Sequence, residues 1–204
     1  MAKLPEPPRP LTTPPETKLL LAGARLWRIY MRGGRRPTSF GDFRAFGPTS
    51  SRFDHHDTPP RVQAKGILYA ADDPTTCLAE AFQATRVIDR HAGEPWLVGF
   101  ETARDLTLLD LTGAWPTRAG ASMAINSGPR PRARRWSQAI YDAYAGVEGL
   151  WYASSMHANR PSVALYERAE AAVPKTPSFH RALSDPAIRG RIDAAAMRLG
   201  YRLV

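Results

Sequence analysis

The sequence predicts an α+β fold, and two observations support this prediction. Apolar runs typical of strands and amphipathic stretches typical of helices follow one another without the regular βαβ alternation of a doubly wound sheet. In addition, no glycine-rich phosphate loop follows the first expected strand, and the chain has neither a Walker loop nor a GxGxxG signature. The chain of 204 residues fits one domain with a sizeable core, which we expect to span residues 18–204.

The first 17 residues are a proline-rich arm. They contain six prolines and few large apolar side chains, so that they cannot bury enough apolar surface to offset the entropy of ordering. We therefore expect residues 1–17 to be extended or disordered and to lie outside the core.

Residues 66–82 are the most informative stretch, because a short apolar run leads directly into a helix. Asp73 followed by Pro74 is typical of a helix start, where the aspartate caps the first turn. At 100° per residue, Glu80 lies at the edge of the apolar face that includes Cys77. Both a solvent-facing glutamate and one that points into a cleft fit this position.

Before this stretch, the chain holds a strand at 26–30 and a long loop at 33–60. Arg28 lies inside the strand, where an arginine needs an anion, an ion-pair partner or an outward position at a sheet edge. The loop is rich in Gly, Pro and Ser, and loops of this length often line functional sites.

The elements expected after this stretch are assigned by periodicity and by their end signals. They are strands at 96–101 and 106–111, a helix at 133–145 ending at Gly146, strands at 149–152 and 163–166, a helix from Asp185 to Leu199 ended by Gly200, and an edge strand at 201–204.

The formal net charge of +9 makes polyanions plausible partners, namely nucleic acid, a nucleotide phosphate or an acidic protein surface. The densest basic segment is PRPRARR at residues 129–135. Two readings of it stay open: a solvated loop that enters a helix, or a patch that binds a partner.

Cysteine and histidine content argue against a metal centre. Cys77 is the single cysteine, and the five histidines show no ligand spacing, so we expect no metal. Without a membrane span or an apolar signal segment in the sequence, the cytoplasm is the expected compartment.

Three signals occur in a fixed order: arginine in LWRIY, glutamate in the 66–82 stretch, and serine in GLWYASS before an apolar strand. Over residues 24–170 this arrangement resembles the RES domain, a family named for its arginine, glutamate and serine. The three family residues correspond to Arg28, Glu80 and Ser154, and the segment Ser51-Arg52-Phe53 is similar to the family's small residue, arginine and aromatic loop. Residues 1–17 and the helical extension after 170 lie outside the resemblance.

The resemblance implies a fold similar to ADP-ribosyltransferases, with a mixed sheet, flanking helices and an NAD-binding cleft. It also implies a toxin of a bacterial toxin–antitoxin pair, with NAD as substrate and an Xre-like antitoxin in a hetero-oligomer; nucleic acid would be contacted only through the antitoxin, and no membrane is involved. The implied residues are Glu80, Arg28 and Ser154 as catalytic, and Arg52, Tyr69, Ser155 and Phe53 as substrate-binding. Either Ser154 or Ser155 fits the family serine.

Breaking the bond between ribose and nicotinamide builds positive charge on the sugar, which one carboxylate can stabilise. Glu80 fits this role, and the guanidinium forks of Arg28 and Arg52 suit a pyrophosphate. The acceptor stays open between water, phosphate and a protein side chain, which would make the reaction an ADP-ribosyl transfer. A non-catalytic, basic nucleic-acid-binding module is the alternative from a different class.

Overall fold

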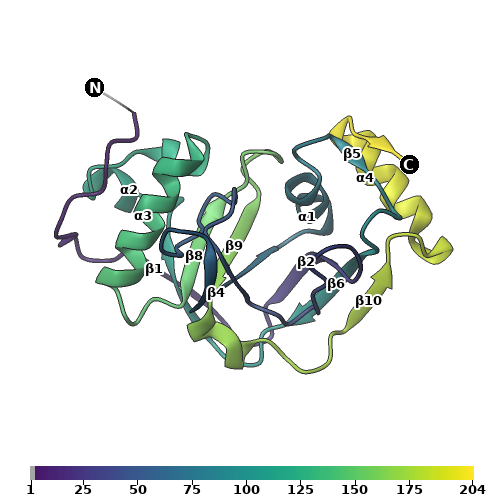
Figure 1. Cartoon of the computed structure of the whole chain (residues 1–204), viewed down its shortest axis with the longest axis horizontal. Coiled ribbons are helices and arrows are strands. Elements are labelled where there is room, and N and C mark those ends of the chain that lie inside the picture. The colour runs from purple at the N-terminus through teal and green to yellow at the C-terminus, as the bar shows by residue number, and fades with distance from the viewer. Residues whose placement is uncertain (1–2) are drawn as a thin grey trace.

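The computed structural model describes residues 3–204, and it has a large mixed sheet with helices on its flanks (Figure 1). The predicted α+β class is confirmed. The strands are β1 (Thr17–Leu20), β2 (Arg25–Met31), β3 (Arg44–Gly47), β4 (Arg61–Ala71), β5 (Val87–Ile88), β6 (Pro95–Glu101), β7 (Leu106–Asp110), β8 (Gly149–Ala153), β9 (Pro161–Tyr166), β10 (Phe179–Ala182) and β11 (Arg202–Leu203). The helices are α1 (Pro74–Ala81), α2 (Trp115–Arg118), α3 (Arg130–Ala143) and α4 (Arg189–Leu199), with short 3₁₀ turns at Met123–Asn126, Glu167–Ala172 and Pro186–Ile188.

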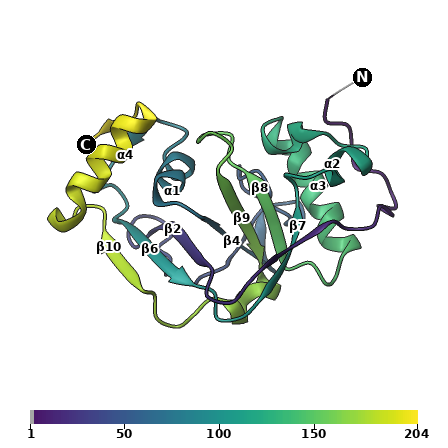
Figure 2. The ribbon, with the colours of Figure 1, turned by 180° about the vertical axis from the view of Figure 1, so that it is seen from behind.

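Nine strands form the main sheet in the order β1-β7-β8-β9-β4-β2-β6-β10, with β3 added alongside β4. The pairing is weakest in the middle. Among the described residues, β2 and β4 share one residue pair, Trp27 with Ala71, whereas β2 and β6 pair from Arg25 to Met31. The sheet therefore consists of two groups of strands, β1-β7-β8-β9-β4 and β2-β6-β10, that diverge from this pair (Figures 1 and 2).

Each group of strands has its own helical cover. Trp136 of α3 packs with Leu109 and Leu150 in the core of the first group. On the second group, Leu78 of α1 packs with Ile192 of α4 in a separate apolar cluster. In Figure 2, α3 and the α1–α4 pair stand on opposite sides of the molecule. Helix α1 thus belongs to the second group, although β4 of the first group leads into it.

The predicted start of α1 is confirmed. The Asp73 carboxylate accepts a hydrogen bond from the Thr76 backbone N–H at 3.1 Å, and Pro74 occupies the first helical position. An aspartate cap satisfies a backbone donor that the helix itself leaves free, and proline there has no N–H to satisfy. This cap fixes the helix axis and, about two turns later, the position of Glu80.

The expected exclusion of the proline-rich arm from the core is wrong for two leucines. Leu4 and Leu11 are buried, at 5% and 8% exposure, in the cluster that contains Trp136. The backbone is also engaged, because the Trp136 indole donates to the Pro5 carbonyl at 2.8 Å. Residues 3–16 therefore lie along α3 as part of its packing, and residues 1 and 2 of the arm lie outside the described part.

Several predicted boundaries are corrected. Helix α3 begins at Arg130, so the basic segment forms its first turns rather than a loop, and it ends at Ala143 before Gly146. Asp185 caps a 3₁₀ turn, and α4 begins only at Arg189. The loop predicted at 33–60 contains β3, and β10 is an element that the sequence did not indicate. The predicted C-terminal strand is confirmed as β11, paired with β5 in a separate small sheet.

Within residues 3–204, no helix is both long enough and apolar enough to cross a membrane.

Candidate active site

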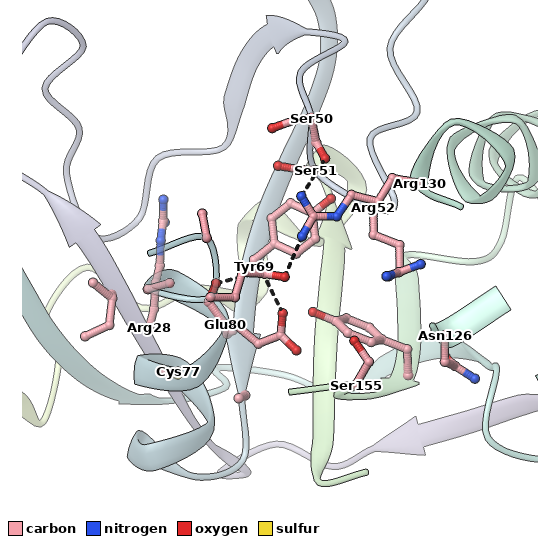
Figure 3. A pocket seen from close by; sticks show the side chains of 17 residues that line it. Arg28, Ser50, Ser51, Arg52, Tyr69, Cys77, Glu80, Asn126, Arg130 and Ser155 are labelled. Atoms are coloured by element: carbon pink, nitrogen blue, oxygen red, sulfur yellow. Dashed lines mark hydrogen bonds between the residues drawn. The ribbon is translucent and has the colours of Figure 1, made fainter. Parts of the chain in front are cut away.

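A cavity of about 330 Å³ lies where the two groups of strands diverge. Its walls come from β2, β4, α1, the loop around residue 51 and the start of α3. This volume falls in the range of small-molecule sites. Five of the predicted site residues line it, as Figure 3 shows: Arg28, Arg52, Tyr69, Glu80 and Ser155.

Glu80 is the acid of the cavity, and both of its carboxylate oxygens are held. Ser154 donates its hydroxyl to Oε1 at 2.5 Å, and the Gln83 amide donates to Oε2 at 3.1 Å. In residues 3–204, no ion pair joins this carboxylate to a cationic side chain. The acid is therefore oriented by neutral donors and its charge is not compensated by a partner.

Ser154 and Ser155 take different positions relative to the cavity. Ser154 is fully buried and does not line the cavity; its oxygen also accepts the backbone N–H groups of Met156 and His157 at 3.2 Å each. Ser155 lines the cavity. Hence Ser154 lies behind the acid as the residue that orients it, whereas Ser155 is in position to contact a ligand.

Arg28 is a buried cation that forms no ion pair with any carboxylate in residues 3–204. Only 8% of the residue is exposed, and its Nη1 donates to the backbone carbonyls of Phe40 at 2.5 Å and Asp42 at 3.0 Å. Burial lowers the pKa of Arg28 to about 10, while the nearby Asp42 acts in the opposite direction. The guanidinium is still charged at neutral pH, and an uncompensated buried charge is costly unless it serves a ligand.

Two further guanidinium groups, those of Arg52 and Arg130, lie across the cavity from Arg28 (Figure 3). Arg52 donates to the Gly128 carbonyl at 2.5 Å, and Arg130 reaches both the Ser50 carbonyl at 3.5 Å and the Gln83 side chain. Burial lowers the pKa of Arg52, and the positive charge of Arg130 lowers it further. These two cations therefore lie close enough to repel each other, an arrangement that favours an anion between them.

Tyr69 and Tyr152 form an aromatic wall of the cavity. Burial raises the pKa of both phenols, and for Tyr152 the charge of Glu80 acts in the same direction, so both rings are neutral at physiological pH. The Tyr69 hydroxyl accepts the Phe53 backbone N–H at 3.2 Å.

The predicted substrate contact of Phe53 is not supported. The side chain is fully buried, packs against Tyr152 with ring centroids 4.8 Å apart, and does not line the cavity. An aromatic residue next to a site arginine is easily assigned to the ligand, but here it anchors the loop that presents Arg52.

Several polar residues of the lining were not among the predicted site residues. They are Ser50, Ser51, Gln83, Asn126, Arg130 and Tyr152. Gln83 lies three residues after Glu80, a spacing that brings side chains together on a helical turn and could have indicated it. Arg130 stood in the basic segment, but its contact with the cavity joins positions that are 47 residues apart in the chain.

The basic segment is largely engaged within the chain. Arg132 and Arg135 pair with Glu6 of the arm at 3.1 and 2.6 Å, and Arg130 faces the cavity. Three of its four arginines are thus committed to contacts with this protein, which weakens the reading as a nucleic-acid patch.

Metal-ligating side chains do not gather at the cavity. In the part of the chain that the structure describes, no group of three or more His, Cys, Asp or Glu side chains could hold a metal ion. Cys77 lines the cavity as a thiol that donates to the Trp27 carbonyl at 2.8 Å, and burial raises its pKa.

The fold is similar to a solved structure described as the crystal structure of the M. tuberculosis MbcT–MbcA toxin–antitoxin complex. The match has a TM-score of 0.54 at 17% sequence identity and covers 86% of this chain and 92% of the matched chain. At this identity the likeness is one of fold. A search of curated proteins found no relative with significant similarity. The family model described as RES domain matches residues 25–184, which is most of the chain, and this match includes Arg28, Glu80 and Ser154. The chain therefore belongs to the RES domain family.

Proposed function

We propose that this protein is the toxin of a toxin–antitoxin pair and that it consumes NAD⁺ by cleaving the bond between nicotinamide and ribose. The observation that carries the proposal is the Glu80 carboxylate, which lines a cavity, is oriented by Ser154 and Gln83, and has no ion-pair partner among the described residues. Membership of the RES family is the second support.

The chemistry needs one negative charge beside the sugar. When the bond between ribose C1′ and the nicotinamide nitrogen breaks, its electron pair leaves with neutral nicotinamide and C1′ becomes oxocarbenium-like. Glu80 stabilises this charge and accepts a hydrogen bond from a ribose hydroxyl. A water molecule or a phosphate oxygen then forms the new bond to C1′, and for water a proton is released to solvent. Because Ser154 already holds Oε1, the carboxylate needs little reorganisation at this step.

The cationic residues fit the rest of the dinucleotide. In the described chain the Arg28 side chain hydrogen-bonds through Nη1, which leaves Nη2 and Nε for an anion, and Arg52 likewise bonds through Nη1. We assign the pyrophosphate to these two forks. Tyr69 then shapes the nicotinamide pocket and Ser155 contacts the ribose or the carboxamide.

A protein partner follows from the toxin role. The matched solved structure is a toxin–antitoxin complex, and we propose by analogy of fold that an Xre-like antitoxin binds this chain in a cytoplasmic hetero-oligomer. Such a partner would block the cavity until it is removed.

The test is NAD consumption by the purified protein, with and without inorganic phosphate. Chromatography that resolves nicotinamide, ADP-ribose and ADP-ribose 1″-phosphate identifies the acceptor, and a Glu80→Gln variant serves as the control for the acid. We expect loss of NAD that requires Glu80. If NAD stays intact in both buffers and in the presence of cell extract as a source of protein acceptors, the proposal fails.

A further inference from the structure

Gln83 occupies a position between the acid and a cation of the cavity. Its Nε2 donates to Glu80 Oε2 at 3.1 Å and to the Glu80 backbone carbonyl at 2.8 Å, and its Oε1 accepts a hydrogen bond from Arg130 Nη2. A chain of hydrogen bonds therefore runs from the Ser50 carbonyl through Arg130 and Gln83 to Glu80, and Figure 3 labels Ser50, Arg130 and Glu80 along the dashed lines. One amide therefore separates two opposite charges that line the same cavity.

The identity of the side chain explains this arrangement. A carboxylate only accepts hydrogen bonds and a guanidinium only donates them, so the group between them must do both. A primary amide does so without a net charge, and its two partners also fix which end faces which. Gln83 thus gives both charged groups a hydrogen bond but neutralises the charge of neither.

We propose that Gln83 is a positioning residue that keeps Glu80 and Arg130 apart, so that the acid stays available to the sugar and Arg130 to an anionic part of the substrate. The inference rests on the proposed function. Without the amide, opposite charges that face one cavity attract each other and close into a direct pair. Such a pair would cancel the charge that the reaction needs and would remove Arg130 from the substrate.

Two variants test this role through kinetics. We expect Gln83→Ala to lower kcat for NAD cleavage by about 10- to 100-fold, the size of a lost hydrogen bond to a charged group. We assign this loss to an ion pair that forms between Arg130 and Glu80. The double variant Gln83→Ala with Arg130→Met cannot form that pair, so its kcat should be higher than that of Gln83→Ala. Its KM should be above the parental value, because Arg130 no longer contacts the substrate. A residue that merely supports the fold would not give such a recovery.

Arg134→Met is the matched control, because it removes a guanidinium from the same helical turns, and Arg134 does not line the cavity. Its kcat and KM should equal the parental values. A parental kcat in Gln83→Ala would overturn the inference, and so would a double variant whose loss equals the product of the two single losses.

A readout independent of activity separates this inference from the proposed function. In a crystal structure of Gln83→Ala we expect the Arg130 guanidinium within 4 Å of the Glu80 carboxylate, the usual ion-pair distance. If Arg130 keeps its parental position in this variant, the proposed role of Gln83 as a positioning residue is contradicted, whatever the activity of the variant. Absence of NAD cleavage by the parent would instead contradict the proposed function and leave the structural result to decide on Gln83.

Discussion

Two clusters of charged side chains in this molecule differ in how their charges are satisfied. We define the cavity cluster as Arg28, Arg52, Glu80 and Arg130. The loop cluster consists of Arg44, Asp54, His55, His56 and Glu167. In residues 3–204 no member of the cavity cluster takes part in an ion pair, whereas in the loop cluster Asp54 pairs with Arg44, and a histidine ring lies next to each of the two carboxylates.

Asp54 illustrates the saturation of the loop cluster. Its carboxylate pairs with Arg44 at 3.0 Å and accepts bonds from the Thr49 backbone at 2.6 Å and from the His56 ring. Burial alone would raise the pKa of Asp54, but the His56 and Thr49 hydrogen bonds and the Arg44 charge hold it well below its usual range. The charge is thus fully used in holding the 44–56 loop.

The comparison separates charges that are held within the chain, as in the loop cluster, from charges without an ion-pair partner in residues 3–204, which the proposed function assigns to a ligand. The loop cluster supports the loop that presents Arg52, and the cavity cluster is left with charge to offer. Substitutions in the cavity cluster should therefore change the kinetics of NAD cleavage, and substitutions in the loop cluster should change the free energy of unfolding.

The largest effect is expected for Glu80→Gln in the cavity cluster. Loss of the negative charge beside the sugar should lower kcat by about 1,000-fold, equivalent to about 4 kcal/mol of transition-state stabilisation. Because glutamine replaces one carboxylate oxygen with an NH₂ group, one of the hydrogen bonds from Ser154 and Gln83 is weakened, and we expect a loss of stability of about 1 kcal/mol, seen as a midpoint of thermal unfolding lower by a few degrees. Activity assays and calorimetry on the same preparation check both parts. A variant that is inactive because it unfolds at a much lower temperature would show that Glu80 holds the fold, as the loop cluster does.

The next effect is expected for Glu167→Gln in the loop cluster. Burial raises the pKa of Glu167, but the His55 ring, the Gly66 N–H and the Tyr141 hydroxyl outweigh it and lower the pKa to about 2. A depressed carboxyl pKa stabilises the folded state above the unfolded value of 4.5, and this stabilisation is lost as the pH falls towards 2. We expect about 2–3 kcal/mol lower stability at pH 7, with a smaller dependence on pH between 5 and 2.

Urea unfolding of parent and variant across this pH range measures the effect. Glu170→Gln is the matched control, because Glu170 lies in the same 3₁₀ turn and is exposed. Burial also lowers the pKa of His55, so the parent should begin to lose stability already as the pH falls below 6.5. Equal stability curves for Glu167→Gln and parent would show that pairing in the loop cluster does not hold the fold.

The smallest effect is expected for Arg28→Lys. A lysine keeps the charge but cannot donate to the Phe40 and Asp42 carbonyls and to an anion with one planar fork. We expect KM for NAD to rise about 10-fold with kcat changed less, equivalent to about 1.4 kcal/mol of binding. An unchanged KM in steady-state assays would mean that Arg28 is a structural cation, which would place it with the loop cluster.

Local signals in the sequence were sufficient for the part of the site that lies on one strand and helix. Asp73 caps α1 as the short stretch predicts, whereas the same stretch left Glu80 open between solvent and a cleft, and only the resemblance to the RES domain favoured the cavity that Glu80 lines. The arm was misjudged because its composition says nothing about Trp136, the surface on which Leu4 and Leu11 pack.

Gln83 and Arg130 show the other limit of sequence reasoning. The spacing of Gln83 after Glu80 and the basic segment around Arg130 are local signals, but the hydrogen bond between the two residues depends on the packing that brings α1 and α3 to the same cavity. The order of Ser154 and Ser155 around Glu80 was similarly open, since it depends on the turn that follows β8.

The single residue pair between β2 and β4 has a mechanical consequence. A sheet that is hydrogen-bonded along every strand is stiff, but here the two groups share one backbone-paired position, Trp27 with Ala71, and are otherwise held together by a buried apolar cluster with side chains from β2, β6, β4, β7 and β9. Glu80 lies on α1, which packs on the group β2-β6-β10, whereas Ser154 and Arg130 belong to the other group of strands and its helix. Rotation of one group against the other would move the acid away from Ser154 and Arg130, and it is opposed by the shared apolar cluster as well as by the hydrogen bond from Ser154 to Glu80.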